Sequence, residues 1–173
     1  MTRLWEWRQE LTAGQPYQEW SSYSDDQRYR WWYERRWACG PALCWVGLNP
    51  ATGDTDGKRR PTLAKVVRWA QREGCSAVVV VNLFSWRATN PGDLGTAADP
   101  IGPLTDEVIE RESARAGVTL VAWGAHKAAT ERAAHVLPLL TSPVCAGLTK
   151  SGQPRHPLYT PVATHVRPYP LPR

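Results

Sequence analysis

The chain has 173 residues and a formal net charge of +5, and 42% of its residues are hydrophobic. This length fits one domain with a buried core, and this composition excludes a disordered chain. No apolar run reaches the roughly 18 residues that a membrane helix requires, and residues 1–10 mix Trp, Arg and Glu, unlike a signal peptide. We therefore expect a cytoplasmic protein. Ten tryptophans against a single phenylalanine, and the basic excess itself, are the unusual features.

The positive charge is concentrated in two separate stretches. Residues 38–75 contain six basic and three acidic side chains, and residues 118–173 contain six and one. If the fold brings these two stretches to one face, that face suits a partner that carries phosphate groups. A solvated surface with extra arginines is the alternative.

The cysteine pattern argues against a metal site. The four cysteines form no CxxC pair, whereas structural zinc sites use closely spaced ligand pairs. They are Cys39, Cys44, Cys75 and Cys145. We expect reduced thiols, no metal and no cofactor, since the chain carries no export signal and no Gly-rich cofactor motif.

The N-terminal third is rich in aromatic and charged residues. Five of these residues have the spacing i, i+3, i+4, i+7 and i+8, which places side chains on one face of a helix. They are Tyr29, Trp32, Tyr33, Arg36 and Trp37. We therefore predict that residues 1–40 form a helical extension packed on the main core. Alternatively, the same rings form a stacking platform for unpaired bases, with neighbouring arginines on phosphates.

From residue 41 onward, short apolar runs alternate with segments of helical spacing. The apolar runs predict strands at residues 43–48, 77–81, 118–123 and 143–148. The segments between them predict helices at residues 62–72, 106–116 (after a Thr105 cap) and 124–134. This order predicts an α/β domain over residues 41–160, with three α/β/α layers and a four-stranded, mainly parallel sheet. The proline-rich residues 161–173 are expected to be an extended tail.

Open parallel sheets bind ligands beyond the carboxyl ends of their strands. The residues that follow the four predicted strands are, in chain order, Asn49, Asn82, Gly124 and His156. The phosphate-binding motifs GxGxxG and GxxxxGK[ST] are both absent from the chain, so no Gly-rich nucleotide loop competes with these residues.

The motifs at the strand ends occur in a recognisable order. They read Val46-Gly47-Leu48-Asn49-Pro50, Val81-Asn82-Leu83-Phe84, Ala122-Trp123-Gly124-Ala125-His126 and Arg155-His156-Pro157-Leu158. This series resembles the uracil-DNA glycosylase superfamily, whose members carry a water-activating motif after the first strand, a base-reading Asn after the second, a WG turn after the third and a late His-Pro motif. The resemblance implies a uracil-DNA glycosylase-like fold and hydrolysis of N-glycosidic bonds in DNA.

At finer grain the chain resembles the domain-of-unknown-function family 1643, over residues 28–160. The RYxW, LNPST, NLF, RAT, WG and GxPRHPL motifs of that family correspond to Arg28–Trp31, Leu48–Thr52, Asn82–Phe84, Arg87–Thr89, Trp123-Gly124 and Gly152–Leu158. Many members have Asp before a Pro-Thr pair, whereas this chain has Arg60 before Pro61-Thr62. If that Asp is catalytic in them, either Asp54 or Asp56 takes its place here or the chemistry of this chain differs from theirs.

The glycosylase resemblance implies roles for the strand-end residues. As the catalytic pair, Asn49 would bind the attacking water through its carbonyl oxygen, and His156 would donate a hydrogen bond to the departing base. Asn82 offers one acceptor and one donor, the pattern needed to read the edge of a base. The small Ala51 leaves room for a substituent at the pyrimidine 5-position. The other base-binding residues are expected to be Gly47, Leu48 and Phe84, with Phe84 or Trp86 stacking on a flipped base.

Contacts with the DNA backbone are expected around the WG turn and the late His-Pro motif. They are assigned to Gly124, Ala125, Lys150, Ser151, Arg155, Leu158 and Tyr159. The Gly124-Ala125 turn would offer helix N-terminal amides to a phosphate, and Leu158 or Tyr159 would fill the vacated position in the base stack. The expected partner is single- or double-stranded DNA, bound by a monomer.

Three functions therefore compete. The leading one is a hydrolase that cleaves the bond between a damaged or modified base and its deoxyribose in DNA. The second is a non-catalytic nucleic-acid-binding module that keeps the base pocket for recognition. The third is a nucleosidase that acts on free nucleotides.

Overall fold

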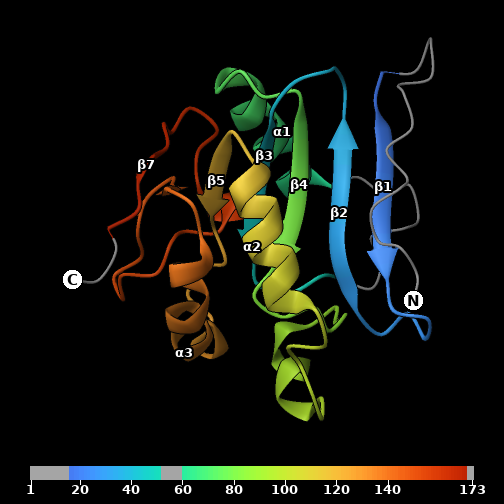
Figure 1. Ribbon diagram of the computed structural model, residues 1–173. Helices are drawn as coiled ribbons and strands as arrows, with labels where there is room; N and C mark the ends of the chain where they lie inside the picture. The colour runs from blue at the N-terminus through green and yellow to red at the C-terminus, as the bar shows by residue number, and fades with distance from the viewer. Residues whose placement is uncertain (1–15, 52–59, 171–173) are drawn as a thin grey trace.

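The computed structural model describes residues 16–51 and 60–170, whose backbone forms a sheet with helices on both faces (Figure 1). The strands are β1 (Gln18–Tyr23), β2 (Arg30–Arg36), β3 (Ala42–Gly47), β4 (Ala77–Asn82), β5 (Val118–Val121), β6 (Pro143–Cys145) and β7 (Arg167–Pro168). The α-helices are α1 (Pro61–Arg72), α2 (Thr105–Arg115) and α3 (Lys127–Val136). Short 3-10 helices are η1 (Pro91–Thr96), η2 (Leu137–Leu139) and η3 (Pro157–Tyr159).

The four strands β4, β3, β5 and β6 lie side by side in that order and are parallel, as the sequence predicts. All of β4 is buried, because helices cover both faces of the sheet, and this explains its run of valines. The predicted width of four strands is wrong. β1 and β2 extend the sheet antiparallel beyond β4, and β7 does so beyond β6, so the sheet is mixed and has seven strands.

The predicted three-layer α/β/α arrangement is confirmed. On one face, α2 and α3 pack on the sheet through residues such as Val108 and Ala133, and α1 covers the other face with the fully buried Trp69 (Figure 1). Neighbouring residues of one strand serve opposite layers, since Val46 faces the α2 and α3 side while Trp45 faces the α1 side.

The predicted N-terminal helix is wrong over the described residues, because Trp32, Tyr33 and Arg36 belong to strand β2. Tyr33 lies opposite Val80 in the antiparallel β2–β4 ladder, and its ring is buried in the core on the α1 side. Pairing satisfies the backbone groups of β2 and of the β4 edge together, and this outweighs a helix-like spacing of side chains. Residues 1–15 of the predicted extension lie outside the described residues.

Two helix starts and the tail also differ from the prediction. Thr105 is the first residue of α2 rather than its cap. Its hydroxyl donates to the carbonyl of Ile101 (2.6 Å), whereas a capping hydroxyl would accept from a helix N–H. α3 begins later than predicted, after His126. The tail packs on the domain, because β7 pairs with β6 and the indole N–H of Trp69 in α1 donates to the Val162 carbonyl (2.8 Å).

The thiols are free, as expected from the cysteine pattern. Cys44, Cys75 and Cys145 are buried, and Cys39 is exposed. Within the described residues, none of the helices combines the length and the apolar character that crossing a membrane demands.

Candidate functional site

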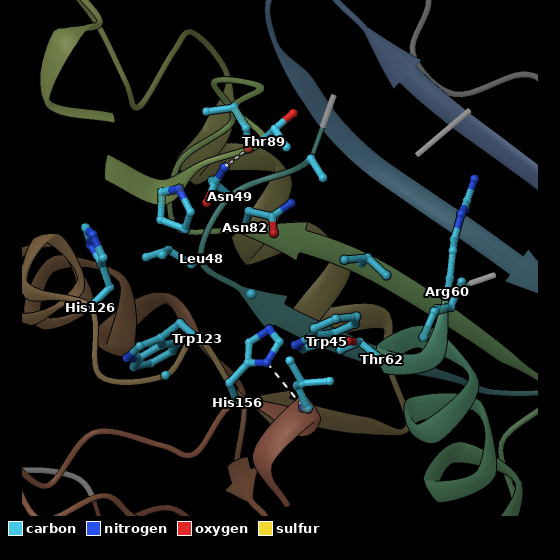
Figure 2. Close-up of a pocket in the computed structure, with 18 of the residues that line it drawn as sticks. Trp45, Leu48, Asn49, Arg60, Thr62, Asn82, Thr89, Trp123, His126 and His156 are labelled. Carbon is cyan, nitrogen blue, oxygen red and sulfur yellow. Dashed lines mark hydrogen bonds between the residues drawn. The ribbon is translucent and has the colours of Figure 1, made fainter. Parts of the chain in front are cut away.

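A cavity of about 960 Å³ opens at the carboxyl ends of β3, β4 and β5, on the α1 side of the sheet (Figure 2). It brings together Asn49, Asn82 and His156, which follow three different predicted strands. The predicted site residues that line it are Gly47, Leu48, Asn49, Ala51, Asn82, Gly124, Ala125, His156, Leu158 and Tyr159. The cavity therefore lies at the edge of the sheet where parallel strands usually hold their ligands.

Asn49 is fixed by its own loop. Its amide nitrogen donates to the carbonyl of Ala88 (2.8 Å) and, at 3.3 Å, to that of Pro50. The backbone N–H of Ala88 in turn donates to the Pro50 carbonyl (3.0 Å), so the two loops hold each other. Because these bonds use the amide nitrogen, the amide oxygen of Asn49 is the group left to hold a water or a ligand.

The RYxW motif contacts the RAT motif, which belongs to the segment that holds Asn49. The backbone N–H of Arg87 donates to the carbonyl of Arg28 (2.9 Å), and that of Arg30 donates to the carbonyl of Ser85 (2.9 Å). The ring of Trp86 packs edge to face on that of the RYxW tyrosine, with centroids 5.4 Å apart. The motifs are therefore adjacent in space, and they position the segment on which Asn49 rests.

Asn82 ends β4, and its side chain is only 3% exposed. Its amide nitrogen is enclosed and has no hydrogen-bond partner in the part of the chain that the structure describes, which costs roughly 1–3 kcal/mol for a buried donor. Gly47 lies opposite in the β3–β4 register, and a β-carbon there would lie 2.8 Å from the Asn82 amide oxygen. A half-turn of the amide exchanges its oxygen and nitrogen, so Asn82 can present an acceptor or a donor to a ligand.

His156 is held as a neutral donor. Its Nδ1 accepts a hydrogen bond from the backbone N–H of Leu158 (3.2 Å). A neutral imidazole has one donor and one acceptor nitrogen, so the proton lies on Nε2, the nitrogen turned toward the cavity (Figure 2). Burial lowers the pKa of His156, and the positive charge of Lys65 lowers it further.

The groups around His156 come from several elements. Lys65 on α1 donates to the Leu158 carbonyl (3.1 Å), which fixes its charge beside η3. The Trp45 ring lies edge-on to the imidazole, with centroids 6.2 Å apart. Gly124 has φ +84°, and a β-carbon there would lie 3.2 Å from the β-carbon of His156, so a larger residue would both strain the turn and displace the imidazole.

A smaller pocket of about 320 Å³ adjoins the cavity and is lined by Gly124, Ala125, Thr149, Lys150, Arg155, His156 and Tyr159. Lys150 and Arg155 give it positive charge. The predicted free helix amides are wrong at Gly124, because its N–H donates to the Pro154 carbonyl (3.0 Å) and α3 begins only after the turn. Tyr159, at 75% exposure, stands at the rim of both hollows.

Phe84 and Ser151 are not brought to the site. Phe84 is 6% exposed and packs in the core on the α2 and α3 side, so it cannot stack on a base in the cavity. Trp86, the alternative stacking residue, also lies outside the lining of both hollows. Ser151 is exposed, with its hydroxyl 3.0 Å from that of Thr149, but it does not line the smaller pocket.

The cavity has a cationic end that sequence reasoning missed. Arg30 and Tyr33 reach it from β2, and Arg60 and Thr62 reach it from the start of α1. The guanidinium carbons of Arg30 and Arg60 lie 5.8 and 5.1 Å from the centroid of the Tyr33 ring. The sequence did mark Arg60, because many family members have Asp at that position before the Pro-Thr pair. Arg30 and Tyr33 could not be placed at the cavity, because the segment that forms β2 was predicted to be a helix.

Glu19 in β1 anchors the tyrosine at this end. The Tyr33 hydroxyl and the Arg35 guanidinium (2.9 Å) both donate to its carboxylate. Burial opposes ionisation of Glu19, but these hydrogen bonds and the charges of Arg35 and Arg60 outweigh it, and its pKa lies below the ordinary value. Burial and the bond to Glu19 raise the pKa of Tyr33, which therefore remains a neutral phenol.

His126 was also missed. It caps α3, with its Nδ1 accepting from the backbone N–H of Ala128 (3.3 Å), and it lines the main cavity at the end away from Arg60 (Figure 2). A histidine directly before a helix is an unusual cap, and the late start of α3 is what turns its side chain to this role.

Comparison with known protein families matches residues 30–158 to the family described as protein of unknown function (DUF1643). The chain belongs to DUF1643. The match runs from Arg30 at the cationic end of the cavity to Leu158 beside His156, so it contains the strands, helices and loops that build the site. No curated protein and no solved structure matches the chain.

The described lining of this DUF1643 cavity is rich in hydrogen-bond donors. They include Asn82, His156 and Arg60, and no carboxylate is among the lining residues that the structure describes. Asp54 and Asp56 lie outside those residues. In the same described ranges, no three His, Cys, Asp or Glu side chains gather as metal ligands. The arrangement suits a ligand with several acceptors, such as base carbonyls and phosphate oxygens.

Proposed function

We propose that this DUF1643 protein binds a base flipped out of DNA and hydrolyses its N-glycosidic bond, as the resemblance to uracil-DNA glycosylases implies. The observation that carries the proposal is the meeting of Asn49, Asn82 and His156 in one cavity. We also propose that strands β4, β3, β5 and β6 with their helix layers form a uracil-DNA glycosylase-like core, to which β1, β2 and β7 are additions.

The departing base is the part of the reaction that the site supports best. Cleavage of the N-glycosidic bond leaves positive charge on the sugar and negative charge on the base. The Nε2–H of His156 donates to a base oxygen as that charge develops, and a neutral donor keeps its proton throughout. Loss of one such donor typically slows a reaction about 100- to 1,000-fold.

Asn49 supplies the water. Its amide oxygen accepts a hydrogen bond from a water placed below the sugar, while the bond to Ala88 prevents the amide from rotating. An amide is a weak general base, so the expected rate is modest and most of the acceleration comes from stabilising the departing base.

Asn82 reads the base. Its buried amide gains the hydrogen-bond partner that it lacks in the free protein when a base edge offers an acceptor to it. Gly47 leaves the space that this amide occupies, and the small Ala51 in the lining leaves room for a substituent on the base.

Lys150 and Arg155 in the smaller pocket contact phosphates next to the flipped nucleotide. Leu158 and Tyr159 are 47% and 75% exposed, beside the cavity mouth, and they fill the vacated position in the stack. Arg155 is well placed for this role because its Nε donates to the Leu148 carbonyl (2.9 Å), which orients the guanidinium.

A non-catalytic base-binding module is the second candidate. The observation that favours it is the absence of a carboxylate from the described lining of the cavity, since a carboxylate is the usual activator of water in glycosidic hydrolysis. The same pocket would then recognise a modified base without releasing it.

The test uses oligonucleotides that each carry one uracil, hypoxanthine or 5-substituted pyrimidine, single- or double-stranded, assayed for alkali-labile abasic sites. We expect base release from at least one of them, slowed about 100- to 1,000-fold in His156→Ala. His135→Ala, an exposed histidine on α3 outside both hollows, is the matched control and leaves the rate unchanged. Binding without base release would establish the module, and release from free nucleosides alone would establish a nucleosidase.

A further inference from the structure

The main cavity is larger than a base requires. Pockets of roughly 300–1,000 Å³ hold whole drug-sized ligands, and this one, at about 960 Å³, continues past Asn82 to the beginning of α1. Arg60, Pro61, Thr62 and Leu63 line that end. None of these residues has a role in the reaction proposed above.

Helix α1 begins at this end with backbone N–H groups that have no acceptor among the described residues. Arg60 makes no side-chain capping bond, and the first turn contains no acidic residue. The N–H of Ala64 donates to the Arg60 carbonyl (2.9 Å), and Pro61 has no N–H, so Thr62 and Leu63 carry the first N–H groups without an acceptor in the helix. The Arg60 guanidinium lies 3.9 Å from the Glu19 carboxylate, which it shares with Arg35. The positive end of the helix dipole adds to the charge of these two guanidinium groups.

Two donors that do not belong to the helix lie unpaired in the same cavity. The side chains of Trp45 and Asn82 are 9% and 3% exposed, and among the described residues neither the indole nitrogen nor the amide nitrogen has a hydrogen-bond partner. Both residues line the cavity, with Asn82 on one wall and Trp45 on the other, beside Nε2 of His156 (Figure 2). Buried donors without acceptors are rare in proteins, and they point to a ligand that carries several acceptors.

We propose that the α1 end of the cavity binds a phosphate group of the nucleotide whose base lies between Asn82 and His156. The phosphate oxygens accept from the backbone N–H groups of Thr62 and Leu63 and pair with the Arg60 guanidinium. The position of the base rests on the proposed function, whereas the choice of phosphate rests on the donors alone. A phosphate monoester of a free nucleotide and a phosphodiester of DNA share this chemistry.

The first test titrates the full chain with inorganic phosphate while its backbone N–H resonances are followed by NMR. We expect the resonances of Thr62 and Leu63 to shift. Arg60→Gln weakens phosphate binding about tenfold, the factor that the loss of one charge-assisted hydrogen bond produces. Arg68→Gln removes the same charge from an exposed position of the same helix and leaves the affinity unchanged.

Two further ligands distinguish the sources of the phosphate. One is deoxyuridine 5′-monophosphate, with deoxyuridine as its phosphate-free control, and the other is a short oligonucleotide that contains one deoxyuridine. If Arg60→Gln weakens binding of the monophosphate but not of the nucleoside, the site takes the monoester of a free nucleotide. If it weakens binding of the oligonucleotide alone, the site takes a phosphodiester of the strand. Either result supports a phosphate site.

The proposal is overturned if inorganic phosphate leaves the Thr62 and Leu63 resonances unmoved, or if Arg68→Gln weakens binding as much as Arg60→Gln. Base release is not a readout here, so the two proposals can fail separately. Phosphate binding at α1 without base release from any substrate refutes the glycosylase alone. Base release that Arg60→Gln leaves unchanged, with no phosphate binding at α1, refutes the phosphate site alone.

Discussion

Gly47→Ala tests the packing that gives Asn82 its position in the cavity. The new β-carbon would lie 2.8 Å from the Asn82 amide oxygen and 3.7 Å from the Trp45 indole. Gly47 does not adopt a left-handed conformation, so the substitution adds no backbone strain and acts through this contact. Asn82 must leave its rotamer, which costs about 0.5–1.5 kcal/mol, and overpacking of a buried site costs about 1–3 kcal/mol.

Urea denaturation should therefore show that Gly47→Ala lowers the free energy of unfolding by about 1–3 kcal/mol. Gly95→Ala is the matched control, since a β-carbon at Gly95 meets nothing within 4 Å and its φ is not left-handed. In an Asn82→Ala background the clash is absent, and the double-mutant cycle should give a coupling of about 1 kcal/mol. If Gly47→Ala lowers the free energy of unfolding by the same amount in the native and the Asn82→Ala backgrounds, the proposed contact with the Asn82 amide is refuted.

Three further outcomes are expected. The pKa of His156 lies below 6.5 in the folded protein, so the unfolded chain takes up a proton on His156 first as the pH falls. The free energy of unfolding therefore falls as the pH drops below about 6.5. Denaturation at several pH values should show this pH dependence reduced in His156→Gln and kept in His135→Gln. Asn49→Asp sets a carboxylate against the Ala88 carbonyl, and urea denaturation should show that the free energy of unfolding falls by about 1–3 kcal/mol. An unchanged midpoint of unfolding would contradict this prediction. Tyr159→Ala should weaken duplex binding in fluorescence anisotropy while stability changes by less than about 0.5 kcal/mol, because the ring is 75% exposed; unaltered DNA affinity would exclude it from the interface.

The parallel centre of the fold could be predicted from the sequence because its signal is local. The valines of β4 and the short apolar run of β3 are buried on both faces, and that environment selects continuous apolar residues. β2 could not be predicted in the same way. Its aromatic residues match a helix face, and the reason that they form a strand is a long-range pairing, such as that of Tyr33 with Val80, which no local pattern contains.

The candidate site was predictable to the extent that strand ends are predictable. Asn49, Asn82 and His156 follow recognisable strands or motifs, and the fold gathers them in one cavity. Phe84 was misplaced because β4 ends at Asn82, after which side chains no longer alternate between the two faces. The cationic end depends on Arg60, the residue before α1, and on β2. It could not be predicted from a sheet of four strands, because β2 lies outside those four.

Chromatographic measurement of free base tests the central claim most directly. The full chain is incubated with the oligonucleotide that gives the most abasic sites, and the released base is quantified for the native chain, His156→Ala and His135→Ala. We expect free base and abasic strand in equal amounts, a rate reduced about 100- to 1,000-fold in His156→Ala, and no change in His135→Ala. Free base that appears equally fast without the His156 imidazole, or no free base from any oligonucleotide that the protein binds, would contradict the account.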